Sequence, residues 1–271
     1  MTDWTQYPWL RPPQGWRIGI DGRYWDGVIP TDFPTPAFIG LKATGFDIAG
    51  DHLSRDFPLQ WAAAKRLGIP PLPFHWFTYR SNAFDAAEHG RLQAEVFIDA
   101  IKAVGAKAPM AVAIDVEDKP SLKGVRAVTA LRACLLFVQA AGFHPVIYSA
   151  RWFWTDYLTP YALYYHPTWS PYQYDLWQAD PPPDDPPFGW PPAGQVIRQY
   201  YLDWSAPGFH AKIDVNWVRQ TWVDRWLVAN PEPVPAPAPP PHDDCAAQLS
   251  GIQEWYARLR DVVDKPPPGL S

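Results

Sequence analysis

The chain has 271 residues, of which 47% are hydrophobic and 16 are tryptophan, and its formal net charge is −5. The apolar content is enough for a large core, while the acidic balance argues against a nucleic-acid partner, which would select clustered Lys and Arg. No run of about 18 apolar residues occurs in the sequence, so we expect no membrane insertion. Only two cysteines are present, which excludes a small disulfide-stabilised fold.

Short strand-like runs alternate with longer helical patterns along the first 150 residues. Strands are expected at 17–21, 37–43, 72–77, 110–117 and 145–149. Helices are expected near 55–67, 82–104 and 124–141. This alternation is typical of βα units that build a parallel sheet.

The later part of the first domain keeps the strands but loses the helices. Segments 175–179, 195–200 and 212–216 have strand-like patterns, and the connections between them are rich in proline, as in Pro181-Pro182-Pro183. An eight-stranded barrel whose last third lacks helices fits this pattern. Such barrels commonly occupy about 200 to 250 residues as one domain.

A proline tract marks the end of this domain. Residues 231–241 read Pro-Glu-Pro-Val-Pro-Ala-Pro-Ala-Pro-Pro-Pro, which favours an extended polyproline II spacer. We therefore divide the chain into a barrel at 1–229, a linker at 230–242 and a tail at 243–271. Apolar residues of the tail recur at helical spacing: Leu249, Ile252, Tyr256, Leu259 and Val263. We expect a short amphipathic helix that self-associates or binds a protein partner.

Two acidic residues stand at the end of the strand expected at 110–117. Alternate side chains of a strand share a face, so Asp115 and Glu117 follow Ala111 and Ala113 on one side, while the larger apolar side chains face the helices. The Cα atoms of the two acids would lie roughly 6.5 Å apart, two strand rises of about 3.3 Å. Like charges this close raise the pKa of one carboxyl group, which suits a general acid.

Two further acids occupy similar positions on other strands. Asp21 closes the first expected strand and Asp214 lies in the last one, so closure of the barrel would make them neighbours. Each Asp by itself could be only a strand-end cap or a turn former. Acids from three strands that meet at the C-terminal end of a barrel, however, form the kind of site that glycoside hydrolysis requires.

Eight short segments occur in a characteristic order along 17–220: Gly19-Ile20-Asp21, Lys42-Ala43-Thr44, Phe74-His75-Trp76-Phe77, Ile114-Asp115-Val116-Glu117, Ile147-Tyr148-Ser149, Leu176-Trp177-Gln178-Ala179, Arg198-Gln199-Tyr200 and Ile213-Asp214-Val215-Asn216. Together they resemble glycoside hydrolase family 25, a family of lysozymes that includes phage endolysins. The resemblance implies an irregular (β/α)₅β₃ TIM-like barrel. It also implies cleavage of the β-1,4 bond between N-acetylmuramic acid and N-acetylglucosamine in peptidoglycan glycan strands. In this resemblance Glu117 is the proton donor, and Asp115, Asp21 and Asp214 are its acidic partners.

Side chains near the predicted strand ends complete the expected site. We expect Tyr148, Trp177, Tyr200 and His75 to contact the saccharide, because aromatic rings cover the apolar face of a sugar. Arg23, two residues after Asp21, is expected to contact the saccharide or a peptide carboxylate of the substrate. Core packing is the alternative for the rings, and a hydrogen-bonded structural role is the alternative for His75. The histidines show no metal-ligand spacing, so neither a metal nor another cofactor is expected.

Departures from the family pattern leave other functions open. Gly22 and Arg23 replace the hydrophobic residue and the serine that usually follow the first Asp, which permits a catalytically retired barrel that binds cell wall or builds a virion. A chitinase-like barrel fits poorly, since Ala113 stands where that family has an acid. The first residues carry no secretion signal. We therefore expect a protein made in the cytoplasm of a phage-infected host that acts on the wall, as an endolysin or a virion-associated lysin.

Overall fold

The computed structural model describes residues 11–22, 25, 27, 29, 33, 35–45, 54–79, 85–117, 124–150, 153, 156, 169–179, 194–205, 209 and 212–227. The backbone divides into two units, Met1–Pro231 and Glu232–Ser271. The linker and the helical tail expected at 230–242 and 243–271 lie outside the described residues, so both stay predictions.

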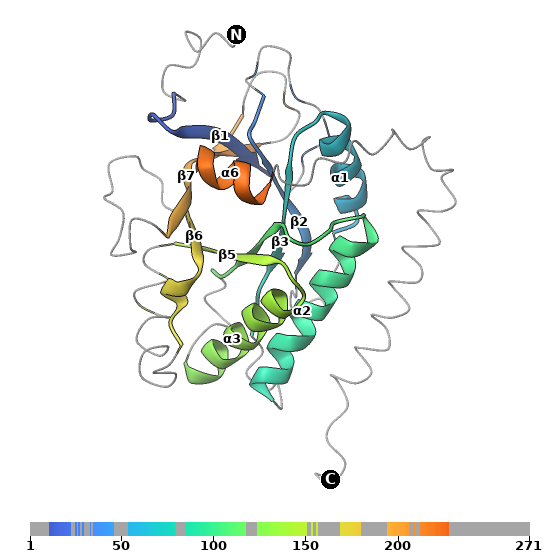
Figure 1. Ribbon diagram of the computed structural model, residues 1–271, viewed down its shortest axis with the longest axis vertical. Coiled ribbons are helices and arrows are strands. Elements are labelled where there is room, and N and C mark those ends of the chain that lie inside the picture. Colours follow the sequence, from blue (N-terminus) through green and yellow to red (C-terminus); the bar gives the residue numbers. More distant parts are fainter. Residues whose placement is uncertain are drawn as a thin grey trace. The chain divides into compact units, whose positions relative to one another are not determined.

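Eight strands form a closed barrel in which each strand pairs with the next along the chain and β8 pairs with β1 (Figure 1). The strands are β1 (Trp16–Asp21), β2 (Ile39–Gly45), β3 (Pro71–Trp76), β4 (Ala111–Asp115), β5 (His144–Ser149), β6 (Asp175–Ala179), β7 (Gln195–Trp204) and β8 (Ile213–Arg219). All eight predicted strands are confirmed, with ends shifted by a few residues.

The direction of β8 differs from that of the other strands. Strands β1 to β7 run parallel, whereas β8 is antiparallel to both β7 and β1. Asp214 stands near the start of β8 and Asp21 ends β1, yet the antiparallel register places these two residues directly opposite each other. A parallel last strand would have carried residue 214 to the far end of the barrel. The reversal therefore brings the fourth acid to the mouth formed by the C-terminal ends of the other strands.

Helices α1 (Phe57–Arg66), α2 (Ala86–Ala103) and α3 (Val125–Ala140) follow β2, β3 and β4, and they cover the outside of the barrel (Figure 1). They confirm the three predicted helices. A short 3-10 helix, η4 (Pro171–Gln173), precedes β6, and α6 (Gln220–Trp226) follows β8. The described residues between β6 and β8 contain no helix, as the proline-rich connections predicted.

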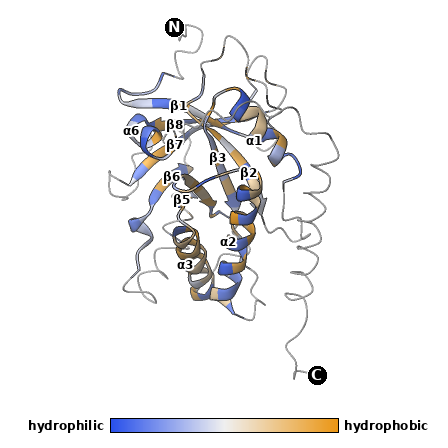
Figure 2. Cartoon of the chain, turned by 45° about the vertical axis from the view of Figure 1, so that its right-hand side comes forward, coloured by the Kyte–Doolittle hydropathy of each residue, from blue (hydrophilic) through white to orange (hydrophobic). Residues whose placement is uncertain are grey.

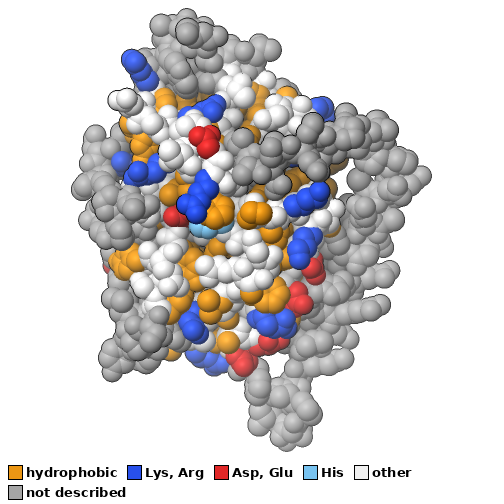
Figure 3. All heavy atoms as spheres, viewed as in Figure 1, with side chains coloured by type: hydrophobic (Ala, Val, Ile, Leu, Met, Phe, Trp, Pro, Cys, Tyr) orange, Lys and Arg blue, Asp and Glu red, His pale blue; other side chains and the backbone are white. Residues whose placement is uncertain are grey.

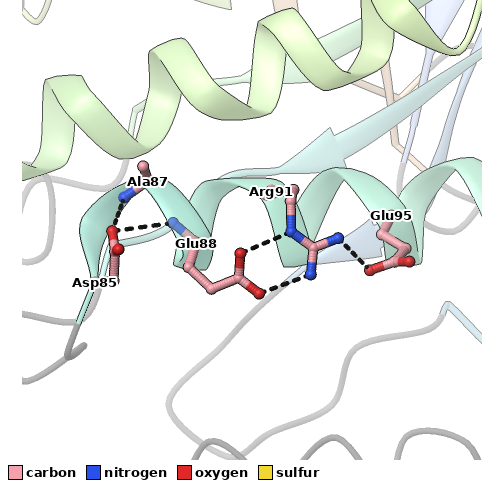
Figure 4. A network of polar contacts seen from close by, with 5 residues as sticks. All are labelled: Asp85, Ala87, Glu88, Arg91 and Glu95. Atoms are coloured by element: carbon pink, nitrogen blue, oxygen red, sulfur yellow. Dashed lines mark hydrogen bonds and ion pairs between the residues drawn. The ribbon is translucent and has the colours of Figure 1, made fainter.

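Helix α2 has polar contacts in its first turns that define where it starts (Figure 4). Asp85 is the N-cap, and its carboxylate accepts hydrogen bonds from the backbone N–H groups of Ala87 at 2.8 Å and Glu88 at 3.2 Å. The cap satisfies two of the free N–H groups at the helix start. Arg91 then bridges Glu88 at 2.7 Å and Glu95 at 3.0 Å, and such exposed pairs each contribute only about 0.3–0.5 kcal/mol.

The apolar side chains of the barrel form two layers. Val112, Ile114 and Val116 belong to the outer layer, which packs against the helices through residues such as Leu131 and Cys134. Ala111 and Ala113 belong to the inner layer, as strand alternation predicted. Figure 2 shows hydrophobic stretches along the central strands and on the helix faces turned toward them.

Small residues inside the barrel leave space for large rings. Phe38 and Trp177 meet edge to face there, with ring centroids 5.6 Å apart. A Cβ atom on Gly19 would lie 2.0 Å from the Phe38 ring, so this position of β1 requires glycine. Trp222 and Val223 of α6 pack against the same inner cluster.

On the face seen in Figure 3, basic and acidic side chains are interspersed with apolar ones. Within the described ranges, no helix has the length and hydrophobicity needed to cross a membrane.

Candidate active site

A pocket with a cavity volume of about 160 Å³ opens at the barrel mouth. Nine residues line it: Asp21, Lys42, Phe74, Trp76, Asp115, Glu117, Tyr148, Trp177 and Asp214. All four acids expected from the sequence are among them. Tyr148 and Trp177, two of the five residues expected to contact substrate, are there as well.

Strand β4 places its two acids on the same side of the barrel wall. Asp115 is the last residue of β4 and is buried, and Glu117 follows two positions later and is partly exposed. The backbone N–H of Val116 donates to the carbonyl of Tyr148 at 2.8 Å, so the ladder with β5 continues beyond the end of β4. This pairing carries the strand alternation on to Glu117, which lines the pocket together with Asp115.

Asp21 and Asp214 form a second acid pair, across the β1–β8 junction. Loss of hydration inside the protein raises the pKa of Asp21 well above its ordinary value, and the nearby charge of Asp214 raises it further. Burial also raises the pKa of Asp214, to about 6. The pair therefore holds a proton at pH values where exposed aspartates are fully ionised.

Two buried amides contact this pair from inside the barrel. Asn216 donates from Nδ2 to Oδ2 of Asp21 at 2.6 Å, and Gln199 donates from Nε2 to Oδ2 of Asp214 at 3.0 Å. Each amide oxygen in turn accepts a hydrogen bond from a ring that lines the pocket. Trp177 Nε1 donates to Asn216 at 2.7 Å, and Tyr148 donates to Gln199 at 2.9 Å.

The backbone at Asp203 gives Asp214 a further donor. Asp203 has a φ of 54°, in the left-handed region that residues other than glycine seldom adopt. Its N–H donates to Oδ1 of Asp214 at 2.6 Å, which lowers the pKa of Asp214 against the effect of burial. Strained backbone of this kind concentrates at functional sites.

Tyr148 lies among the four acids. Burial raises the pKa of its phenol well above the ordinary value, and the charges of Glu117, Asp115, Asp21 and Asp214 raise it further, in that order. The ring of Tyr148 meets Trp177 edge to face at 5.2 Å between centroids. Trp177 itself is only 2% exposed, so it forms the floor of the pocket more than its wall.

Two residues expected at the site do not line the pocket. His75 is fully buried on the opposite face of β3, where Nδ1 contacts the Thr44 hydroxyl at 2.7 Å and Nε2 contacts the Gln93 amide oxygen at 3.1 Å. This is the structural role given above as its alternative. Tyr200 does not line the pocket either, and its ring stacks on Trp217 with centroids 4.2 Å apart. Arg23 lies outside the described residues.

Three pocket residues were not expected from the sequence: Lys42, Phe74 and Trp76. The ammonium group of Lys42 lies 4.1 Å from the centroid of the Trp76 ring, in a cation–π contact. The alternation of β3 places Phe74 and Trp76 on one face and His75 on the other, but it does not show which of the two faces lines the pocket. For Lys42, the signal was a single basic residue within an otherwise apolar strand. In the described parts of the chain, no group of three or more His, Cys, Asp or Glu residues is arranged to hold a metal ion.

Comparisons with known proteins agree with this geometry. Residues 36–184 match the model of the family described as glycosyl hydrolases family 25. No curated protein sequence matches the chain. Among solved structures, the spore cortex lytic enzyme SleM of Clostridium perfringens has a TM-score of 0.60 at 22% identity, over 77% of this chain and 68% of SleM.

Two further structures share the fold. The CTP1L endolysin has a TM-score of 0.59 at 18% identity, over 77% of this chain and 68% of the endolysin. The autolysin LytC of Streptococcus pneumoniae, solved with a synthetic peptidoglycan ligand, has a TM-score of 0.53 at 17% identity, over 74% of this chain and 46% of LytC. At these identities the likeness shows the fold, whereas the family match extends over more than half of the chain. The chain therefore belongs to the glycosyl hydrolases family 25 and is a glycoside hydrolase of the lysozyme type.

Proposed function

We propose that the enzyme hydrolyses the β-1,4 bond between N-acetylmuramic acid and N-acetylglucosamine in peptidoglycan. Family membership supports a wall glycan as substrate. The observation that carries the proposal is the pocket itself, in which four carboxyl groups from three regions of the barrel lie beside aromatic rings. Paired carboxyl groups are what most glycosidases use to break a glycosidic bond.

We assign the role of proton donor to Glu117. It is the more exposed acid of the Asp115–Glu117 pair, so it can reach the glycosidic oxygen of a polymer that lies across the mouth. Glu117 would give its proton to that oxygen as the bond to the anomeric carbon breaks. It would then take a proton from the water that attacks the same carbon, which restores the acid.

Asp115 is the second carboxylate of the proposed reaction. It either attacks the anomeric carbon directly, or orients the N-acetyl group of the substrate so that the amide oxygen attacks instead. Both routes place a negative charge close to the positive charge that develops on the sugar ring. Trapping of a glycosyl ester on Asp115 would establish direct attack, and tight binding of an oxazoline-type inhibitor would establish substrate assistance.

The rings and the lysine suit a charged, acetylated sugar polymer. Trp76 and Tyr148 are partly exposed in the pocket and offer faces or edges to the C–H groups of a pyranose. Lys42 brings a positive charge into a pocket that otherwise carries four acids, and so offers a contact for a carboxylate or carbonyl of the substrate.

Release of soluble fragments from purified peptidoglycan tests this function. Glu117→Gln should keep the fold and lower turnover by at least about 100-fold, because the amide cannot donate and recover the proton. Glu95→Gln changes a partly exposed glutamate of α2 that does not line the pocket, and should retain wild-type turnover. Equal turnover in the two variants would refute the assignment. Binding of peptidoglycan without any release by the wild type would instead identify a catalytically retired barrel.

We also propose that the enzyme reaches the wall as a phage endolysin or a virion-associated lysin. An endolysin is among the proteins that share its fold, which supports this proposal. Mass spectrometry of purified phage particles from the source host tests the virion-associated form. Dependence of host lysis on the coding sequence, with no such protein in the particles, would indicate an endolysin.

A further inference from the structure

Two amides connect the aromatic part of the pocket to the acid pair on β1 and β8. Asn216 of β8 has no exposed surface and Gln199 of β7 is 1% exposed. Neither lines the pocket, so neither would touch a sugar. Each nevertheless bonds to one pocket ring and one pocket acid, which gives two parallel chains: Trp177 to Asn216 to Asp21, and Tyr148 to Gln199 to Asp214.

Trp177 determines which end of Asn216 faces the acid, and the carboxylate of Asp214 determines the orientation of Gln199, because the Tyr148 hydroxyl can donate or accept. An indole N–H can only donate a hydrogen bond, so the oxygen of Asn216 must face Trp177 and its NH₂ group must face Asp21. The hydroxyl of Tyr148 donates to the oxygen of Gln199 and leaves the NH₂ group to Asp214. If an amide turned over, its oxygen would point at a carboxylate, which is repulsive.

We propose that Asn216 and Gln199 are positioning residues that hold the Asp21–Asp214 pair in a fixed orientation and favour its ionised form, with Trp177 and Tyr148 locking each amide. Only the expected effect of the two amides on catalysis rests on the proposed function. The effect of the amides on the Asp21–Asp214 pair is a property of the substrate-free protein.

Neighbouring negative charges oppose ionisation of the Asp21–Asp214 pair, whereas hydrogen-bond donors to the two carboxyl groups favour it. Asp214 and Glu117 raise the pKa of Asp21, while the amides of Asn216 and Gln199 lower it. The charge of Asp203 raises the pKa of Asp214, and its N–H lowers it. The other ionisable groups that line the pocket are Asp115, Tyr148 and Lys42. Loss of either amide should therefore let the pair keep its proton to higher pH.

Near-isosteric variants test the amides directly. Asn216→Leu and Gln199→Met remove the donors, and Gln195→Met is the matched control, because Gln195 is a buried amide of β7 that bonds to Gln178 instead of an acid. Carbon-13 NMR titration of the carboxyl groups in the substrate-free protein gives the readout. The titration midpoint should rise by about half to one pH unit in the two test variants, the equivalent of one hydrogen bond, and should not move in the control.

Ring variants test the locking step without removing an amide. Tyr148→Phe keeps the pocket shape and takes away only the hydroxyl that donates to Gln199, so it should raise the same titration midpoint. Combined with Gln199→Met it should add no further rise, since both changes break one chain. The acid limb of the pH–rate profile on peptidoglycan should move upward together with the titration.

The outcomes separate this inference from the proposed function. Folded Asn216→Leu, Gln199→Met and Tyr148→Phe proteins that titrate like the wild type would overturn the inference, even if their activity fell. Titrations that shift as expected would support it, even if no form of the protein cleaved peptidoglycan. In that case only the proposed function would fail.

Discussion

His75 allows the opposite faces of one strand to be tested against each other. His75→Ala would remove a fully buried ring that links Thr44 of β2 to Gln93 of α2 through hydrogen bonds of 2.7 Å and 3.1 Å. The amide oxygen of Gln93 can only accept, so Nε2 of His75 carries the proton and the hydroxyl of Thr44 donates to Nδ1. The substitution therefore breaks two hydrogen bonds and leaves a cavity between the barrel and α2.

The magnitude follows from these two losses. Each hydrogen bond contributes about 1 kcal/mol, and truncation of a large buried side chain to alanine costs about 2–5 kcal/mol. We expect the free energy of unfolding to fall by about 4 kcal/mol. This is a large part of the roughly 5–15 kcal/mol that is typical of folded domains. Unfolding in urea, followed by tryptophan fluorescence, measures this change.

Trp76→Ala on the pocket face of the same strand is the contrasting variant. It should raise KM for peptidoglycan fragments and cost less stability than His75→Ala, because Trp76 is partly exposed in the pocket. His75→Ala should leave kcat/KM within about two-fold of the wild type at a temperature where it is folded. A stable His75→Ala protein with a strongly raised KM would refute this reasoning and return His75 to the substrate site.

Three further variants test contacts of the barrel, and a truncation tests the tail helix expected from the sequence. The pKa of Asp214 is about 6 in the folded protein against an ordinary 3.8, so the folded state binds more protons than the unfolded state between these pH values. The free energy of unfolding therefore falls as the pH rises through this interval, and the urea midpoint of the wild type should fall with it. In Asp214→Asn, this fall should be smaller. Gly40→Ala should lower kcat/KM by about tenfold or more, since its Cβ would lie 2.5 Å from that of Asp21; unchanged kinetics would contradict the close approach. Gly90→Ala should lower the thermal midpoint by several degrees, because its Cβ would lie 1.8 Å from the Ala130 carbonyl oxygen of α3. Truncation after Asn230 should convert an oligomer to a monomer in light scattering; a monomer at both lengths would exclude self-association of the tail.

Strand alternation explains why the acids of β4 could be located from the sequence. Large apolar side chains occupy one row of 110–117, and Ala111, Ala113, Asp115 and Glu117 occupy the other, so only one assignment of faces is reasonable. In β3 both rows are bulky and largely apolar. Pattern alone therefore could not decide whether His75 or Trp76 faces the pocket, and their faces depend on the register with β2 and β4.

Other features of the site depend on contacts between distant segments. The position of Asp214 at the mouth results from the antiparallel direction of β8, which the alternation of strands and helices does not encode. Tyr200 lies one residue from Gln199, beside an irregularity in the β7–β8 pairing, so its face could not be predicted from period alone. Gln199 and Asn216 are ordinary amides in the sequence, and they acquire a role only once the closed barrel places them between rings and acids.

The identity of the sugar at the new reducing end tests the central claim most directly. Purified peptidoglycan is digested, the products are reduced with borohydride, and mass spectrometry identifies the reduced sugar, with Glu117→Gln as the matched inactive control. A muramidase would produce reduced N-acetylmuramic acid in the wild-type digest and not in the control. Reduced N-acetylglucosamine, or equal products from both proteins, would contradict the assignment.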